Sequence, residues 1–271
     1  MKANFHTHTV FCDGTDTPEQ LVLAALDRGF DALGFSGHGE TPFDHSYCMN
    51  SISARRYRSE IAALRTRYAG QISLFCGVEQ DYCAGAPTTG YDYMIGSVHY
   101  LMIGDTYLPV DENPALLRQG ADRYFGGDFY ALVEAYYRAV ADVAERMGAD
   151  LIGHFDLIAK FNEGGQLFDE QHLRYRAAAF SAAEALLKSG KPFELNTGAM
   201  ARGLRSVPYP APFLAEWIAA RGGKLVLSSD CHDHAALDFG FEETLSRAQA
   251  EGWATAVSGD GFLSMLESRR R

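Results

Sequence analysis

The chain has 271 residues, of which 47% are hydrophobic and 22% charged, a composition typical of a globular protein with a substantial core. Its formal net charge of −11 argues against binding to a long nucleic acid, because the phosphate backbone would be repelled. We expect no membrane span, since no apolar run is long enough, and no secretory signal, since the N-terminal residues lack an apolar core. The five cysteines are scattered without a Cys-x-x-Cys pair, which predicts reduced thiols in a cytoplasmic protein.

Short apolar runs alternate with amphipathic stretches along the whole sequence. The apolar runs predict strands at residues 3–5, 32–36, 72–76, 93–98, 151–153, 193–196, 224–227 and, less clearly, 254–257. The stretches between them predict helices, N-caps included, at residues 17–28, 53–68, 128–147, 169–188, near 210–220, 241–250 and 261–269. The expected N-caps of the first four helices are Thr17, Ser53, Asp128 and Asp169. Thr17 is predicted to form a capping box, with Pro18 at the first helical position.

Repeated strand-then-helix units predict an α/β fold with a parallel sheet, and seven or eight units in this length predict a closed barrel. No linker rich in serine, glycine and proline divides the sequence, so residues 1–271 are predicted to form a single domain. Residues 101–125, which include Pro109, Pro114 and Gly120, predict a long loop. Such a loop in a compact domain is often a lid or a binding segment.

Histidine and acidic residues follow the predicted strands at their carboxyl ends. His6 and His8 are two residues apart on the first strand, so their rings share one face, and Asp13 comes after them in an Asp-Gly turn. The later strands lead into His38, Glu79, His99, His154, Asp230 and His232. Six of the nine histidines therefore lie at the edge where parallel barrels build their active sites.

Each of these residues has an ordinary explanation when taken alone. A lone His99 or His154 is more often part of a core, and Glu79 could be a buried ion-pair partner. Together, six imidazoles and three carboxylates on one face would stay unsatisfied without cations. This supply of ligands predicts two or three divalent ions, because one tetrahedral zinc takes about four ligands. Mixed imidazole and carboxylate ligands favour zinc, iron or manganese.

As a set, these motifs resemble the PHP (polymerase and histidinol phosphatase) superfamily of metal-dependent phosphoesterases. The matching pieces are His6-Thr7-His8, Asp13, Gly37-His38, Gly77-Val78-Glu79, Gly96-Ser97-Val98-His99, Gly153-His154-Phe155-Asp156 and Ser229-Asp230-Cys231-His232. The segment Phe193-Glu194-Leu195-Asn196-Thr197 and the later Pro208-Tyr209-Pro210 are similar to the monofunctional histidinol-phosphate phosphatases of this superfamily.

The resemblance implies a distorted (β/α)7 TIM-like barrel with a trinuclear metal site at the C-terminal ends of the strands. By this resemblance, one ion would be held by His6, His8, Glu79 and Asp230. A second would be held by Glu79, His99 and His154, with Glu79 as a bridge. The third would be held by Asp13, His38 and His232.

Closely spaced divalent ions lower the pKa of a water and clamp the two oxygens of an in-line displacement at phosphorus. We therefore expect hydroxide attack on a small phosphate monoester, without a covalent phosphoenzyme. The predicted catalytic residues are Glu79, Asp230 and His232. The predicted phosphate contacts are Lys160 and Arg202, because cationic groups bind phosphate and a guanidinium does so bidentately. Arg205 is a weaker candidate, and a solvated surface charge is the alternative explanation for all three.

By the same resemblance, the expected reaction is hydrolysis of L-histidinol phosphate to L-histidinol and phosphate in histidine biosynthesis. Glu40, Asp44 and His45 could meet a cationic group on the substrate, although a polar loop explains them as well. His172 and His234 are predicted surface residues. Two alternatives stay open: a related phosphoesterase acting on a nucleotide, a sugar phosphate or an oligonucleotide 3′ end, and a non-catalytic metal-binding domain. The sequence leaves the metal identity, the acid for the leaving group and the oligomeric state open.

Overall fold

Parallel strands form one curved sheet in the computed structural model, which describes residues 1–86 and 88–270. Its seven strands follow one another in chain order: β1 (Ala3–Asn4), β2 (Ala32–Phe35), β3 (Ser73–Asp81), β4 (Tyr93–Ser97), β7 (Leu151–Ile152), β8 (Phe193–Asn196) and β9 (Leu225–Ser228). Past the last strand, Thr7 pairs in parallel with Cys231, and the His8 amide donates to the Cys231 carbonyl at 2.8 Å. The sheet is therefore a nearly closed, distorted TIM-like barrel, as predicted.

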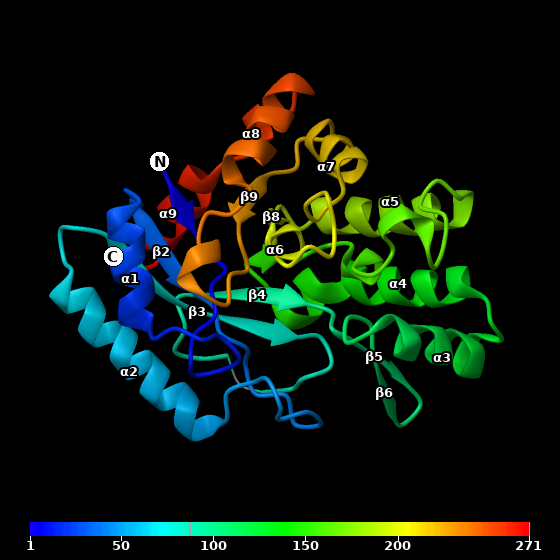
Figure 1. Cartoon of the computed structure of the whole chain (residues 1–271), viewed down its shortest axis with the longest axis horizontal. Coiled ribbons are helices and arrows are strands. Elements are labelled where there is room, and N and C mark those ends of the chain that lie inside the picture. The colour runs from blue at the N-terminus through cyan, green and yellow to red at the C-terminus, as the bar shows by residue number, and fades with distance from the viewer. Residues whose placement is uncertain (87, 271) are drawn as a thin grey trace.

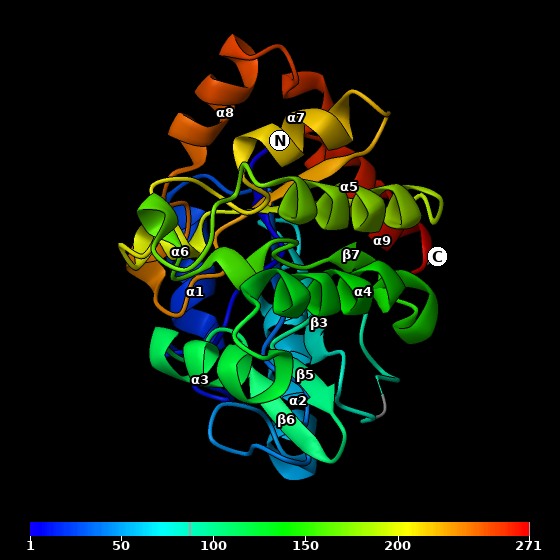
Figure 2. The same cartoon turned by 90° about the vertical axis from the view of Figure 1, so that its right-hand side faces the viewer.

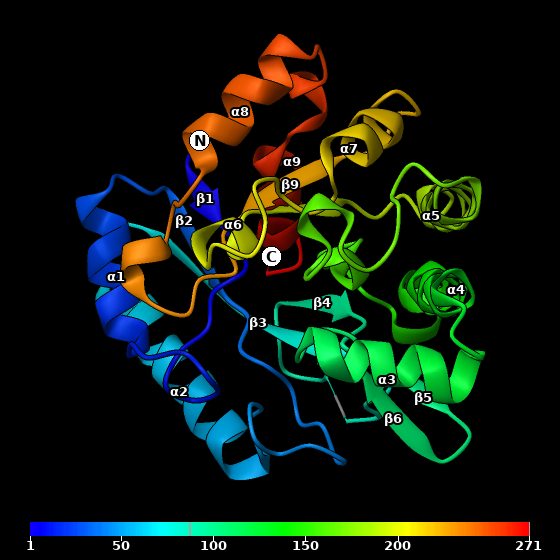
Figure 3. The same cartoon turned by 45° about the vertical axis from the view of Figure 1, so that its right-hand side comes forward.

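Helices cover the outside of this barrel (Figures 1 and 3). The longer ones are α1 (Pro18–Asp27), α2 (Ser51–Arg67), α3 (Pro114–Phe125), α4 (Phe129–Met147), α5 (Leu173–Leu187), α7 (Pro212–Ala219), α8 (Phe241–Ala250) and α9 (Gly259–Ser268). The short turns are η1 (Leu157–Ala159), η2 (Glu163–Gly165), α6 (Gly198–Ala201), η3 (His234–Ala236) and η4 (Ala254–Ala256). Figure 2 shows α3, α4 and α5 side by side, with α4 packed against both neighbours. Among the described residues, none of the helices combines the length and the apolar character that crossing a membrane requires.

The helix starts follow from capping side chains, and two of the four predicted caps are wrong. Thr17 closes a capping box with Gln20 at the start of α1, and Asp128 accepts two amides at the start of α4. Helix α2 is capped by Asn50, whose side chain accepts the amides of residues 52 and 53, while Ser53 completes the box from inside the helix. Helix α5 is capped by His172 instead of Asp169. Both errors place the start of a helix within three residues of its true position.

The predicted loop at 101–125 is an ordered hairpin followed by a helix. Strands β5 (Tyr100–Ile103) and β6 (Thr106–Pro109) pair antiparallel across a tight turn in which Gly104 has a φ of 59°, a conformation that glycine adopts without strain. Helix α3 begins after Asn113, which caps it, with Pro114 in its first turn. The prolines of this stretch predict a loop, whereas in the structure Pro114 marks the start of a helix.

Two predicted strands also differ in the structure. Residues 254–256 form the turn η4, and only Val257 makes a single bridge to Leu225 of the sheet. Strand β3 is longer than predicted and runs to Asp81, so Glu79 lies within it. The register pairs Glu79 with Ile95 of β4, and the Glu79 side chain is buried in the barrel interior.

The N-terminal end of the barrel interior is filled by aromatic side chains. Tyr93, the first residue of β4, extends its side chain into the interior and donates its hydroxyl to the Phe5 carbonyl at 2.6 Å. A Cβ on Gly77 would come within 2.3 Å of the Tyr93 ring, so glycine is required there. Helix α9 closes this end with Phe262, whose ring centroid lies 5.1 Å from that of Phe5. The opposite end of the interior is left to polar side chains.

Candidate metal centre

The nine candidate ligands predicted from the sequence all lie at the C-terminal end of the barrel. His6, His8 and Asp13 follow β1, His38 follows β2, and Glu79 is in β3. His99 follows β4, His154 follows β7, and Asp230 and His232 follow β9. The strand ends are neighbours in the sheet, so side chains that are up to 226 positions apart in the sequence (His6 and His232) meet at one place.

The deepest part of this group is formed by His6, His8, Glu79 and Asp230, all of which are buried. The Nε2 atoms of His6 and His8 lie 3.1 Å apart and point at the same region. The Glu79 Oε2 atom lies 3.1 Å from His6 Nε2. Asp230 Oδ1 lies 3.2 Å from His8 Nε2. Two imidazole nitrogens that face each other at this distance, flanked by carboxylates, suit a shared cation.

Glu79 is the centre of the whole group. Its two carboxylate oxygens contact five imidazole rings within 3.5 Å, those of His6, His8, His38, His99 and His154. Ser97 donates its hydroxyl to Oε1 at 2.6 Å and so orients the carboxylate. One carboxylate with several ligand residues on each of its oxygens is the arrangement expected of a bridging group.

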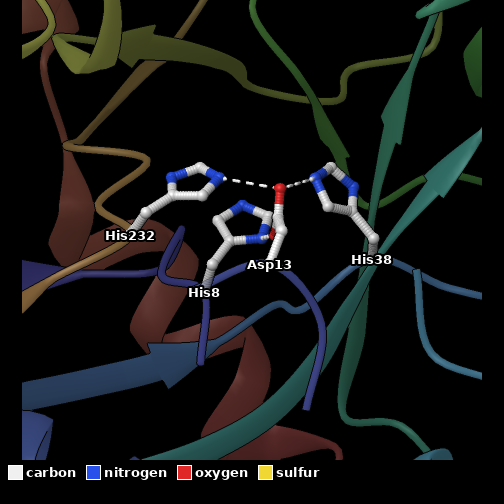
Figure 4. Close-up of side chains that lie close together, drawn as sticks. All are labelled: His8, Asp13, His38 and His232. Carbon is white, nitrogen blue, oxygen red and sulfur yellow. Dashed lines mark hydrogen bonds and ion pairs between the residues drawn. The ribbon is translucent and has the colours of Figure 1, made fainter. Parts of the chain in front are cut away.

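The outer part of the group is formed by His8, Asp13, His38 and His232 (Figure 4). Asp13 Oδ2 lies 3.2 Å from His232 Nε2 and 3.6 Å from His38 Nε2. The ring of His8 stacks on that of His232 with centroids 4.2 Å apart. The side chains of Asp13 and His232 are about 30% and 29% exposed, so this part of the group opens to solvent.

The pKa values of the clustered side chains show that the carboxylates call for positive charge between them. Burial alone would lower the pKa of His6, but the carboxylates of Glu194, Glu79 and Asp230 raise it to about 10. The pKa of Glu79 is held well below its usual value, because the surrounding histidines outweigh the effect of burial. His38 differs, since burial lowers its pKa to about 3. The carboxylates thus favour positive charge between them, a preference that a divalent cation also satisfies.

In the part of the chain that the structure describes, three sets of ligand atoms are close enough to hold an ion, with all atoms of a set within 4.8 Å of one another: His8, Asp13, His38 and His232; His6, His8 and Glu79; and His38, Glu79 and His99. These sets overlap more than the resemblance implies, because His8 and His38 each belong to two of them. The donor set, imidazole with carboxylate in a buried site, fits zinc, iron or manganese.

Lys160 and Arg202, the predicted phosphate contacts, line a cavity of about 430 Å³ that opens over these ligands, here called the metal-centre pocket. The Lys160 ammonium donates to the Asp111 carbonyl at 2.8 Å and to its carboxylate at 3.0 Å. Arg202 lies 3.2 Å from Asp230 Oδ2. Arg205 is buried, donates to the Ala159 carbonyl and does not line the pocket. Both predictions for Arg205, a phosphate contact or a solvated surface charge, therefore differ from its position in the structure.

The outer wall of the pocket carries residues that the sequence did not single out. They come from the loop after β2, from strand β5 and from the segment between β6 and α3: Ser46, Tyr47, Tyr100, Asp111 and Glu112, together with the predicted Asp44. The Tyr100 hydroxyl donates to Asp44 Oδ2 at 2.6 Å and ties β5 to the loop after β2. Glu40 and His45 do not line the pocket. His172 and His234 are exposed, as predicted.

Glu194 is a further residue to which the sequence analysis assigns no role at the site. It is fully buried in β8, and its carboxylate contacts Nδ1 of His6. The signal was present in the sequence, because Glu194 and Asn196 alternate with Phe193 and Leu195 along a strand. Alternation in a fully buried strand places the polar pair on one face, and here that face is the barrel interior.

Comparison with known proteins gives a consistent answer. A family model for the PHP domain matches residues 4–198. A Deinococcus radiodurans protein named probable histidinol-phosphatase is 31% identical, over 93% of this chain and 94% of that protein. The histidinol-phosphatase of Bacillus subtilis is 27% identical, over 91% of this chain and 99% of that protein.

A solved structure extends the likeness to the fold. The histidinol phosphate phosphatase of Lactococcus lactis, crystallised with zinc, L-histidinol and phosphate, matches with a TM-score of 0.68. It is 21% identical, and the match covers 93% of this chain and 94% of that one. Because the family model spans well over half of the sequence, the chain belongs to the PHP domain family.

Proposed function

We propose that this protein hydrolyses L-histidinol phosphate to L-histidinol and phosphate with the help of two or three divalent transition-metal ions. The observation that carries the proposal is the metal-centre pocket, with candidate ligands on its floor, Lys160 and Arg202 at its side and carboxylates on its outer wall. The curated relatives that align over nearly their whole length bear the names histidinol-phosphatase or probable histidinol-phosphatase. Histidine biosynthesis in the cytoplasm is the setting we propose, and all five cysteines are free, as such a setting expects.

The proposed metal ligands are those predicted from the sequence: His6, His8, Asp13, His38, Glu79, His99, His154, Asp230 and His232. Bound there, the ions would lower the pKa of a water and offset the charge of the phosphoryl group. Glu79 suits the bridging role, because five imidazoles surround its two oxygens. His154 and His99 lie on one of these oxygens, and His6 and His38 on the other.

Arg202 and Lys160 are proposed to bind the phosphoryl group. Asp230 directs Oδ1 toward His8 and Oδ2 toward Arg202, so one carboxylate orients both a candidate ligand group and the guanidinium. Lys160 is held from the other side by Asp111. His232, which is 29% exposed at the mouth of the pocket, is proposed to act in catalysis as a ligand of the outermost ion, with its Nδ1 atom held by the Asp230 carbonyl at 3.0 Å.

The charge of the outer wall supports a cationic leaving group. Asp44, Asp111 and Glu112 line this wall, and only Asp111 among them has a lysine partner in the described structure. Carboxylates there would attract the ammonium and imidazolium groups of histidinol and repel an anionic leaving group. Tyr47 and Tyr100 add aromatic faces against which a ring or a cation can lie.

The test is hydrolysis of a panel of substrates, followed as inorganic phosphate for the monoesters and as released label for the oligonucleotide, with Mn²⁺, Fe²⁺ or Zn²⁺ supplied separately. The panel comprises L-histidinol phosphate, AMP, sugar phosphates and an oligonucleotide labelled at its 3′ end. We expect kcat/KM to be highest for L-histidinol phosphate and activity to disappear with a chelator. A clear preference for the oligonucleotide would overturn the substrate, and activity that survives the chelator would overturn the metal-dependent mechanism.

A further inference from the structure

Glu194 presents a carboxylate that is fully buried against the ring of His6. Its Oε1 contacts His6 Nδ1 and accepts the Ser228 hydroxyl at 2.5 Å. Its Oε2 accepts the backbone amide of His154 at 2.8 Å. A buried carboxylate is costly unless it is paired and hydrogen-bonded, and these three donors offset that cost. Glu194 thereby joins β8 to the ends of β1, β7 and β9.

The contact with Glu194 decides which nitrogen of His6 can bind a cation. Glu194 accepts at Nδ1, so that nitrogen carries the hydrogen, and a neutral His6 then has its lone pair on Nε2. Nε2 is the atom that faces the cluster, 3.1 Å from both His8 Nε2 and Glu79 Oε2. A carboxylate behind a ligating imidazole fixes both its tautomer and its ring orientation.

His154 lacks this support, because its buried Nδ1 atom has no hydrogen-bond partner among the described residues. Behind His99, Asp81 Oδ2 lies 3.4 Å from Nδ1, close enough for an ion pair but without hydrogen-bond geometry. Glu194 reaches His154 through its backbone amide instead of its ring. Its effect on a ring is therefore specific to His6, while its effect on His154 is to fix the chain at the end of β7.

We propose that Glu194 is a positioning residue, which holds the His6 ring and the His154 backbone and thereby sets the affinity of the inner metal site formed by His6, His8 and Glu79. The inference rests on the proposed metal-dependent function but adds a residue to it. Glu194 itself is not a ligand in this proposal, because the His6 ring lies between its carboxylate and the other candidate ligands.

The experiment is a Zn²⁺ titration of chelator-stripped full-length protein in competition with a chelator of known affinity. Glu194→Gln is expected to weaken the tightest Zn²⁺ site by roughly 10–100-fold, the range for partners behind a metal ligand. The matched control is Glu134→Gln, which removes a carboxylate paired with Arg174 on the surface of α4 and α5 and is expected to leave Zn²⁺ affinity unchanged. Thermal unfolding of each stripped protein separates a loss of affinity from a loss of folding.

A second readout follows the His6 ring directly. In the zinc-loaded protein, NMR of ¹⁵N-labelled histidine should reveal a downfield Nδ1–H proton that exchanges slowly with solvent, because Glu194 accepts it in a buried site. This signal should move upfield in Glu194→Gln, because a neutral amide oxygen accepts more weakly than a carboxylate. Should that variant fail to fold, Glu194→Asp keeps the charge but not the reach, and we expect it to lose Zn²⁺ affinity and the same signal.

The outcomes are distinct. A folded Glu194→Gln with wild-type Zn²⁺ affinity contradicts this inference and leaves the proposed function standing. An equal loss of affinity in Glu134→Gln also contradicts it, because the effect would then be general. A wild-type protein that binds no metal overturns the proposed function, and the role of Glu194 with it.

Discussion

The two ends of the barrel interior are built from the same strands but do opposite things. At the N-terminal end, Phe5, Tyr93 and Phe262 pack edge to face in a closed apolar cluster. At the C-terminal end, Glu79 is buried among five imidazoles. Aromatic packing stabilises the fold directly, whereas buried charges stabilise it only when they are fully compensated. The apolar end therefore stabilises the fold, and the other end holds the candidate metal ligands.

The largest expected effect is at the polar end. Glu79→Gln removes the charge that the five imidazoles share, so we expect metal and activity to be lost together. The fall in kcat for phosphate release should be on the order of 1000-fold or more, as for loss of a principal electrostatic group. Metal content by mass spectrometry and phosphate release would be measured side by side, with the exposed Glu243→Gln as the control. Full activity in Glu79→Gln would contradict the bridging role.

The next effect belongs to the apolar end. Phe262→Ala opens a cavity beside Phe5 and Tyr93, and the free energy of unfolding should fall by about 3–5 kcal/mol. Its metal content and its kcat below the unfolding temperature should stay near those of the wild type. Chemical denaturation measures the free energy of unfolding, and metal analysis measures the metal content. Ser264→Ala, on the exposed face of α9, is the control. Loss of metal from folded Phe262→Ala would show that the two ends are not separable.

A smaller effect is expected at the side of the pocket. Arg202→Met removes a guanidinium that lies 3.2 Å from Asp230 Oδ2 and lines the pocket. Losing charge-assisted bonds to the substrate costs about 1.5–3 kcal/mol, so kcat/KM should fall roughly 10–100-fold. Arg202→Lys keeps the charge but not the bidentate geometry, so its kcat/KM should lie between those of the wild type and Arg202→Met. Unchanged kcat/KM in Arg202→Met would exclude this arginine from phosphate binding.

The polar end of the barrel could be predicted from the sequence. His6 and His8 are two apart on a strand, and the other candidates follow apolar runs, so a parallel barrel must bring them to one edge. Gly104, Asn113 and Pro114 are local signals of a hairpin turn and a helix start, in a stretch whose prolines predict a loop. The loop predicted at 101–125 is thus an error of element type, whereas the caps of α2 and α5 are errors of boundary, because a cap is decided by one or two side-chain hydrogen bonds.

Other features depend on contacts that no local pattern carries. The pair of Lys160 and Asp111 joins residues 49 positions apart, and it exists only because the hairpin folds over the pocket. Arg205 follows Arg202 closely in the sequence but turns into the protein toward Ala159. Which arginine faces the pocket is set by the turn at α6, and a sequence shows only that both are cationic.

The smallest expected effect tests how closely the polar end is packed. A Cβ on Gly198 would lie 2.9 Å from Asp230 Oδ2 and 3.0 Å from the Arg202 guanidinium, so Gly198→Ala must push this pair apart. Overpacking of this kind costs about 1–3 kcal/mol. Because the pair lies at the pocket, we expect most of that cost to appear as a fall in kcat/KM of about 10-fold, with a small change in stability.

Gly85→Ala is the matched control, because a Cβ there would meet nothing within 4 Å and its φ is outside the left-handed region. Steady-state kinetics and thermal unfolding on both variants distinguish the possibilities. If Gly198→Ala loses stability but keeps its kcat/KM, the contact between Asp230 and Arg202 is a matter of packing. If kcat/KM falls while Gly85→Ala is unaffected, the spacing of that pair is part of the chemistry, and the polar end is as closely fitted as the apolar one.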